Sequence, residues 1–388
     1  MSNLLRSEIF TDVNIIIYYN IQELQLELIH SLILYFRASK VYYDKNKHIK
    51  QYNYYIYMTI VSGIEIDNIN YKRNEIKYAI KNNDPLEDKL HIIAVISNPC
   101  LYARRYILFK EFVKRMEDEE NVELYVVEMA YGSQKFLVSE SKNKKHLQIR
   151  TEIPIWHKEN MVNLAVQKLL PKTYKAFAWV DADIEFESVT WALDTLKILN
   201  GCKDIVQLFS HCIDLSEKET TLNIFNSFGY SFSQEKPYIK TGKDYWHPGF
   251  AWAMTRKAYE KIGGLYDEGV LGSGDNIMAL SLINKADRMN NENYHEDYNQ
   301  SMIDFQERAN QLRLGYTPGV IKHYYHGSKK NRQYTERWKI LMDYKFSPKL
   351  DLKYNKNGIL IPTTHFSTEF QEAIMNYFRE RKEDDFYK

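Results

Sequence analysis

The sequence predicts an α/β fold in which helices cover both faces of a central sheet. Strand-like and helix-like apolar patterns alternate from residue 91 onward, which is typical of βαβ units. The run Ala176–Val180 is apolar throughout, as expected for a central parallel strand that is covered on both faces. Of the 388 residues, 44% are hydrophobic, which is enough for a sizeable core.

The N-terminal part of the chain is predicted to be a separate, small α/β unit. Residues 13–17 and 54–60 have strand-like patterns, and residues 23–35 have a helical pattern. The turn formers at 81–85 then break the pattern before a new apolar strand. We therefore expect an N-terminal unit of unknown role at 1–85, a main domain at 86–348, and a C-terminal tail with a helix at 349–388.

The main domain is predicted to begin with a strand at 92–96, a helix at 102–116 and a strand at 122–127. A helix at 161–170 has one apolar face and is ended by Pro171. The polar stretch at 290–300 is expected to be a mobile loop or an insertion. The remaining elements are strands at 176–180, 205–209 and 250–255 and a helix at 277–283.

Composition excludes several classes of function. Lys and Arg number 52 against 51 Asp and Glu, so the net charge of +1 gives no overall field for nucleic acid or an anionic membrane. Three cysteines, Cys100, Cys202 and Cys212, lack the spacing of a zinc site or a disulfide framework, which favours a reducing compartment. The N-terminus does not resemble a signal peptide, and no run approaches the roughly 18 apolar residues of a membrane span. We expect a soluble protein of the cytoplasm, or of the host cytoplasm or virion if it is viral.

Asp181 and Asp183 directly follow the apolar strand at 176–180. Open α/β sheets bind ligands beyond the carboxyl ends of their strands, so the strand places this pair in the expected ligand crevice. Two carboxylates one residue apart suit a hard divalent cation that bridges to phosphate oxygens. The tripeptide alone is a weak signal, and the alternative is a turn in which both aspartates bind backbone donors.

Two histidines, His323 and His326, end a later apolar and aromatic run and could add an imidazole ligand to the cation, with His326 the first choice. Mixed oxygen and imidazole ligation favours Mn²⁺ over Mg²⁺, although cellular availability could reverse that order. Taken alone, each histidine is more simply explained as an ordinary, partly buried side chain.

A glycine-rich segment contains the candidate base. Gly272 and Gly274 would let the backbone approach a ligand closely, and Asp275 stands at the start of the helix predicted at 277–283. Asp275 could take a proton from an acceptor hydroxyl. It could equally be the helix N-cap.

Further candidates are aromatic and basic. Trp246 and Trp252 could stack on a sugar, although tryptophans beside a strand are more often part of the core. The residues at 328–334 supply cations, Lys329 and Arg332 among them, that could neutralise a diphosphate leaving group. A solvated loop is the alternative for that segment.

These motifs occur in a defined order with Ser97-Asn98-Pro99, the segment at 156–163, the segment at 247–252 and Arg337-Trp338. In this order, from about 91 to 348, the chain resembles the GT-A glycosyltransferases and, within them, family-2-like enzymes of bacteria and large DNA viruses. The resemblance implies a Rossmann-like mixed sheet with helices on both faces. It leaves the first 85 residues unexplained.

The resemblance also implies roles for residues. Asp181 and Asp183 would bind the metal, ribose and diphosphate, His326 would complete the metal site, and Asp275 would be the base of an inverting displacement. Many relatives have a Glu-Asp pair where this chain has Gly274-Asp275. Together with the candidates above, the residues expected around the nucleotide sugar are Ser97, Asn98, Arg105, Glu128, Lys158, Asn160, Asn163, Ala182, Trp246, Gly249, Trp252, Gly274, Lys329 and Arg332.

The predicted function is metal-dependent transfer of a sugar from a nucleotide-diphosphate sugar to an acceptor hydroxyl. A UDP-sugar is the commonest donor, and the acceptor could be a glycan, a protein or a small molecule. One alternative is a sugar-phosphate nucleotidyltransferase, which the lack of a glycine-rich triphosphate loop near the first strand disfavours. The other is a catalytically silent carbohydrate-binding protein with the same fold. A homo-oligomer is compatible with the sequence.

Overall fold

The computed structural model describes residues 59–61, 64–66, 87–242, 244–332 and 336–385. The chain divides into two compact units, residues 1–70 and 71–388. In the first unit, strands β1 (Thr59–Val61) and β2 (Ile64–Ile66) pair antiparallel. The strand predicted at 13–17, the helix at 23–35 and positions 54–58 of the next strand lie outside the described residues. The predicted domain limits stay predictions.

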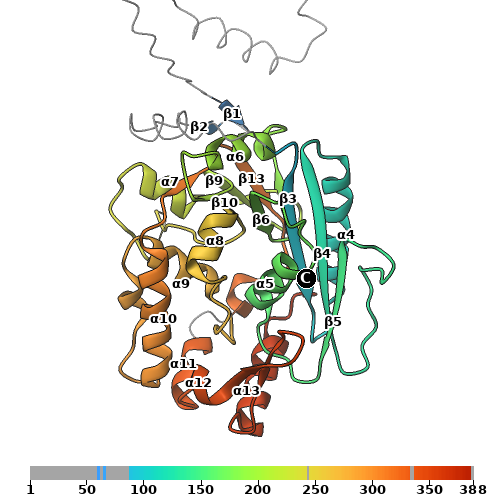
Figure 1. The fold of residues 1–388 in the computed structure, drawn as a ribbon, viewed down its shortest axis with the longest axis vertical. Helices are drawn as coiled ribbons and strands as arrows, with labels where there is room; N and C mark the ends of the chain where they lie inside the picture. Colours follow the sequence, from blue (N-terminus) through green and yellow to red (C-terminus); the bar gives the residue numbers. More distant parts are fainter. Residues whose placement is uncertain (1–58, 62–63, 67–86, 243, 333–335, 386–388) are drawn as a thin grey trace, which may run out of the picture. The chain divides into compact units, whose positions relative to one another are not determined.

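The larger unit contains a seven-stranded mixed sheet (Figure 1). Neighbouring strands run parallel except at β11, which is antiparallel to both of its neighbours, β6 and β8. The five strands predicted in this unit are confirmed, although β8 is shorter than the predicted 205–209. In spatial order the strands are β12 (Leu314–Tyr316), β8 (Ile205–Gln207), β11 (Ala251–Thr255), β6 (Ala176–Val180), β3 (Leu90–Ser97), β4 (Val122–Tyr131) and β5 (His146–Thr151).

Helices cover both faces of this sheet, as predicted. All five residues of β6 are buried, and Phe177 and Trp179 share one apolar cluster with Met161 and Leu164. That face packs against α5 (Lys158–Lys168), α8 (Arg256–Ile262) and α9 (Gly274–Leu282). The opposite face is covered by α4 (Ala103–Asp118) and α6 (Trp191–Leu199), whose buried side chains are not part of that cluster. The predicted helices at 102–116, 161–170 and 277–283 correspond to α4, α5 and α9.

The polar stretch at 290–300 is not a loop throughout, which corrects the prediction. Helix α10 (Glu296–Ala309) begins inside it, where the His295 ring accepts a hydrogen bond from the Asp297 backbone N–H at 3.2 Å. Tyr298 and Met302, one helical turn apart, are fully buried and hold the helix in the core. Shorter helices are α7 (Phe228–Ser233) and the 3₁₀ turns η2 (Ala286–Met289) and η3 (Lys329–Arg332).

A second, four-stranded sheet brings distant segments together at one end of β6. Its order is β10 (Thr221–Asn226), β9 (His211–Leu215), β13 (Val320–His323) and β7 (Ile184–Phe186). Strand β13 is parallel to β9 and antiparallel to β7, so His323 lies opposite both Asp214 and Ile184. Because β7 directly follows the Asp181–Asp183 turn, this register places the turn beside the end of β13.

The C-terminal segment joins the same core. It consists of α11 (Glu336–Asp343), α12 (Pro348–Asp351), the antiparallel pair β14 (Leu352–Tyr354) and β15 (Leu360–Pro362), and α13 (Thr368–Glu380). Phe370, Ile374 and Phe378 of α13 belong to the apolar cluster that includes Trp179.

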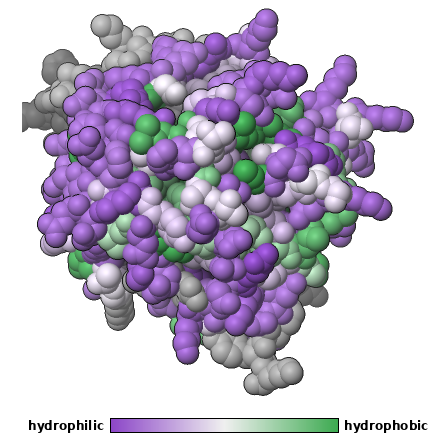
Figure 2. Space-filling model, turned by 90° about the horizontal axis from the view of Figure 1, so that it is seen from below, coloured by the Kyte–Doolittle hydropathy of each residue, from purple (hydrophilic) through white to green (hydrophobic). Residues whose placement is uncertain are grey.

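The outer surface is mainly polar on the face drawn in Figure 2, where hydrophobic side chains form small patches among hydrophilic ones. All three cysteines are free. In the part of the chain that the structure describes, no helix combines the length and the apolar character needed to cross a bilayer.

Candidate functional site

The acidic turn is fixed between two segments at the carboxyl end of β6. The backbone N–H of Asp181 donates to the carbonyl of Phe250 at 2.8 Å. The backbone N–H of Tyr324, just beyond β13, donates to the carbonyl of Asp183 at 2.8 Å. The turn that contains Ala182 therefore has little freedom, and both carboxylates stay where β6 ends.

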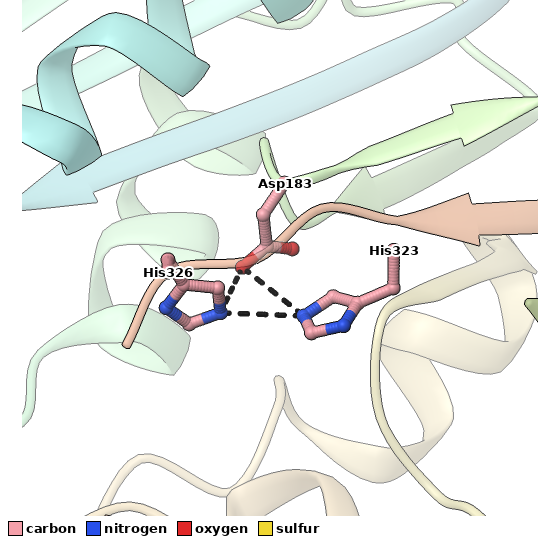
Figure 3. Close-up of side chains that lie close together, drawn as sticks. All are labelled: Asp183, His323 and His326. Carbon is pink, nitrogen blue, oxygen red and sulfur yellow. Dashed lines mark hydrogen bonds and ion pairs between the residues drawn. The ribbon is translucent and has the colours of Figure 1, made fainter. Parts of the chain in front are cut away.

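Asp183, His323 and His326 form a compact group that could hold one metal ion. Figure 3 shows the three side chains converging on one point. Asp183 Oδ2 is 2.8 Å from His326 Nε2 and 3.8 Å from His323 Nε2, and the two Nε2 atoms are 3.2 Å apart. Ligands bound at roughly 2.1 Å to one ion lie about 3 Å or slightly more apart, so this spacing fits one cation.

The hydrogen-bond partners of the two imidazoles bear on the Nε2 atoms that face Asp183. The Asp214 carboxylate can only accept, so His323 Nδ1 donates to it at 2.7 Å, and in a neutral ring the lone pair is then on Nε2. Arg332 can only donate, so His326 Nε2 accepts a hydrogen bond from Arg332 Nη2 at 2.7 Å. A metal ion bound to this nitrogen would have to displace Arg332 from the lone pair. Burial, with the nearby Arg332 cation, lowers the pKa of His326 to about 4, so the ring is neutral, the form that binds metals.

Asp183 supplies the negative charge of the group. Burial alone would raise its pKa, but His326, His323 and Arg332 outweigh that effect and hold the pKa below its usual range. Its Oδ1 atom is buried without a hydrogen-bond partner among the described residues. A divalent cation could bind where the two imidazole nitrogens and the carboxylate oxygen converge, and it would also give the unpartnered carboxylate oxygen a nearby positive charge.

Asp181 differs from Asp183 in its surroundings and is not a member of the three-residue group. Its carboxylate forms an ion pair with Lys158 Nζ at the start of α5. Burial raises the pKa of Asp181, and the positive charge of Lys158 only partly opposes this rise. Burial would lower the pKa of Lys158, but the negative charges of Asp181 and Asp275 outweigh burial and raise it. That Asp181 also binds a metal stays a prediction.

Asp275 lies in the first turn of α9 but does not cap it, so the N-cap alternative is wrong. The N-cap is Ser273, which has a left-handed backbone with φ 74° and no capping bond from its side chain. Asp275 Oδ1 accepts the adjacent Asn276 N–H at 2.8 Å, and Oδ2 would lie 3.0 Å from a Cβ added to Gly249. Gly249 thus leaves room for the Asp275 carboxylate.

Glu159 is a buried carboxyl group that the sequence-based reasoning missed. A Cβ on Gly274 would lie 2.5 Å from Glu159 Oε1, so the lack of a side chain at 274 makes room for Glu159. Burial raises the pKa of Glu159 to about 8, opposed by Lys158 and reinforced by Asp275. The usable sequence signal was an acidic residue next to Lys158 in the first turn of a helix.

Several of the residues expected around the nucleotide sugar have local partners. The Asn98 amide bonds the backbone of Tyr102 twice, at 2.8 and 3.0 Å. Glu128 accepts four hydrogen bonds from residues 137–139, at 2.6 to 3.1 Å. Ser97, Asn98 and Arg105 line a cavity of about 10 Å³, room for one water, which Phe378 of α13 helps to close.

Arg105 is engaged by the C-terminal segment. Its Nη2 donates to Glu383 Oε1 at 2.6 Å, and its Nη1 donates to the Ser97 carbonyl at 2.8 Å. Arg381 Nε also donates to Glu383, at 2.7 Å, and His326 Nδ1 lies 3.9 Å from Glu383 Oε2. Nothing in the charged sequence around Glu383 distinguishes it from solvated neighbours, so this contact could not be predicted.

Several other predicted site residues are packed in the interior. Trp252 is fully buried and its Nε1 donates to the Pro248 carbonyl at 2.7 Å, and Trp246 packs edge-on against Phe228. The structure favours the core interpretation for both tryptophans. The buried amides of Asn160 and Asn163 bond Asp267 at 3.0 and 3.4 Å and tie α5 to the loop before α9.

The basic segment at 328–334 contains η3, whose last residue, Arg332, lies beside the candidate metal group. Arg332 is buried against His326, as described above. The backbone of Lys329 lies in η3, but its side chain is outside the described part of the structure.

Comparison with known proteins identifies no family. No protein-family model matches the chain, and no curated protein matches its sequence. Among solved structures, the catalytic domain of Drosophila β1,4-galactosyltransferase 7 is similar at 8% identity and a TM-score of 0.33, over 74% of this chain and 99% of that chain. A putative nucleotide-diphospho-sugar transferase from Desulfovibrio desulfuricans is similar at 9% identity and a TM-score of 0.28, over 78% and 100%.

The inositol-1-phosphate CTP transferase from T. maritima is similar at 9% identity and a TM-score of 0.31, over 67% of this chain and 97% of that chain. Likeness at this level carries no information on the activity of this chain.

Proposed function

We propose that the chain is a metal-dependent glycosyltransferase that transfers a sugar from a nucleotide-diphosphate sugar to an acceptor hydroxyl. The observation that carries the proposal is the Asp183, His323 and His326 group at the carboxyl end of β6. Ligands of open α/β sheets bind beyond the carboxyl ends of strands, and a diphosphate needs a cation there. A bound Mn²⁺ or Mg²⁺ would neutralise charge on the diphosphate.

The chain's own residues supply the remaining chemistry. Lys158 and Arg332 add fixed positive charge beside Asp181 and His326, respectively, which favours departure of an anionic leaving group. In the displacement, the acceptor oxygen forms a bond to the anomeric carbon, and the bond from that carbon to the diphosphate oxygen breaks with its electron pair. Asp275 accepts the proton of the acceptor hydroxyl, and attack from the side opposite to the diphosphate inverts the configuration at the anomeric carbon.

The test is a screen of nucleotide-diphosphate sugars with and without Mn²⁺, read out by release of nucleoside diphosphate and by thermal shift. A donor that binds only the folded state raises the melting temperature. We expect a UDP-sugar to stabilise the protein only when Mn²⁺ is present. Asp183→Asn should remove both the shift and the turnover, whereas Asp275→Asn should keep the shift and lower turnover by about 10²–10⁴-fold.

Asp204→Asn is the matched control, because Asp204 pairs with Arg313 at 2.8 Å outside the metal group. It should retain both readouts. Consumption of a nucleoside triphosphate and a sugar phosphate with release of pyrophosphate would instead establish the nucleotidyltransferase alternative. Unchanged sugar-nucleotide binding in an Asp181→Ala/Asp183→Ala variant, without turnover in the wild type, would establish the silent binding protein.

We also propose that residues 1–85 recognise the acceptor or form a dimer contact. A chain that lacks them should lose activity toward the acceptor or change its oligomeric state, measured by light scattering. Retention of both would refute this role.

A further inference from the structure

Asp214 is a buried carboxylate directly behind the candidate metal group. It stands on β9, where the parallel register with β13 places it opposite His323. Asp214 and His323 are 2% and 3% exposed, and their side chains meet at 2.7 Å through His323 Nδ1. The opposite nitrogen of the same ring, Nε2, is the atom that faces Asp183 and His326.

The ring of His323 is also held by packing. Phe250 packs on it with ring centroids 4.6 Å apart at 36°. Phe250 has φ 80°, a left-handed backbone that is uncommon for a bulky residue, and its carbonyl accepts the Asp181 N–H. The position of the His323 ring is thus set by a carboxylate at Nδ1 and by an aromatic ring against it.

We propose that Asp214 is a positioning residue for the metal site: it holds the proton on His323 Nδ1 and so directs the Nε2 lone pair toward the cation. This inference rests on the proposed metal-dependent function. Asp214 acts through His323 and is not itself one of the three candidate ligands.

The physical reason is that a neutral imidazole has two tautomers, of which only one can bind through Nε2. Without Asp214, the proton could occupy Nε2 and the ring could rotate within its pocket, and both changes remove a ligand from the ion. Loss of such a partner behind a ligating histidine typically costs about 10–100-fold in metal affinity.

The chain contains a matched pair for the control. Asp351, which is also buried, meets His365 Nδ1 at 2.6 Å, but the His365 side chain is 61% exposed and belongs to the C-terminal segment. Asp351→Asn therefore removes the charge from an equally short Asp–His contact outside the metal group.

The experiment measures Mn²⁺ binding to the full chain by calorimetry and EPR at one fixed pH, without any sugar nucleotide. Asp214→Asn should weaken Mn²⁺ binding by about 10–100-fold, and Asp351→Asn should leave it unchanged. Nitrogen hyperfine coupling should fall from two imidazoles in the wild type to one in Asp214→Ala. Thermal melting without metal shows whether each variant folds. If Asp214→Asn and Asp214→Ala do not fold, Asp214→Ser replaces them, because its hydroxyl keeps a small hydrogen-bond acceptor at this position.

A double-mutant cycle separates positioning from a general structural role. In a His323→Ala background, Asp214→Asn should cause no further loss of Mn²⁺ affinity, because its effect passes through His323. Equal losses in both backgrounds, or wild-type affinity and two coupled nitrogens in Asp214→Ala, would overturn the inference while leaving the metal site intact. A wild-type chain that binds neither Mn²⁺ nor Mg²⁺ would overturn the proposed function and this inference with it.

Discussion

His157, which precedes α5, makes the fold sensitive to acid. Its ring is 1% exposed, with Nε2 2.9 Å from the Leu360 carbonyl and Nδ1 3.3 Å from the Tyr131 hydroxyl. Burial lowers its pKa from 6.5 to about 4, although the Leu360 carbonyl opposes the shift. The unfolded chain therefore binds a proton at a higher pH than the folded chain does.

The sign and size of the effect follow from this difference. Because the folded pKa is the lower one, the full stability is present above pH 6.5 and is lost as the pH falls from 6.5 toward about 4. At about 1.4 kcal/mol for each pKa unit, the loss is on the order of 3 kcal/mol.

Urea unfolding of the wild type and His157→Gln at a series of pH values tests this reasoning. Glutamine does not titrate, so other acid-sensitive groups contribute equally to both proteins. The wild type should lose about 3 kcal/mol more than the variant between pH 7 and pH 4. Parallel curves for the two proteins would show that His157 does not titrate across the transition.

Three further outcomes are expected from urea unfolding at neutral pH. Gly274→Ala should lower the free energy of unfolding by about 1–3 kcal/mol, because its Cβ would lie 2.5 Å from Glu159 Oε1. Glu159→Ala should restore most of that loss in the double variant, and additive effects of the two substitutions would contradict this. Lys158→Met should lower the free energy of unfolding by on the order of 2 kcal/mol, because it leaves Asp181 unpaired. The same substitution should have little effect in an Asp181→Asn protein, and an equal loss in the wild type and in Asp181→Asn would exclude the ion pair as the cause. Gly229→Ala should cost about 3 kcal/mol, because its Cβ would meet a backbone carbonyl on β12 that cannot turn away; near-wild-type stability would refute the packing.

The part of the site that could be predicted is the part encoded locally. The apolar run of β6 predicted both its own limits and the position of Asp181 and Asp183 at its end. His323 and His326 were found because they stand three residues apart after an apolar run. Periodicity and spacing are sufficient when a motif and the element that holds it are contiguous.

The parts that were missed depend on contacts between distant segments. Asp214 lies in a five-residue strand, and its partner His323 is 109 positions away in the sequence. Neither strand alone indicates that the two residues meet. Helix α10 was hidden by its polar composition, although Tyr298, Met302 and Phe305 carried the helical spacing. Asp181 and Asp183 look equivalent in the sequence, but in the structure Asp181 pairs with Lys158 and Asp183 lies against His326.

The contact between Arg105 and Glu383 has a consequence for biosynthesis, since the two residues are 278 positions apart. A ribosome that adds about 5–20 residues each second would need roughly 15 to 55 seconds to pass from one to the other. During that interval the Arg105 guanidinium has no access to its carboxylate, and neither α13 nor β15 is available to cover the hydrophobic residues of α5. The emerging chain would therefore expose this surface to chaperones and proteases until residues 381–385 leave the exit tunnel.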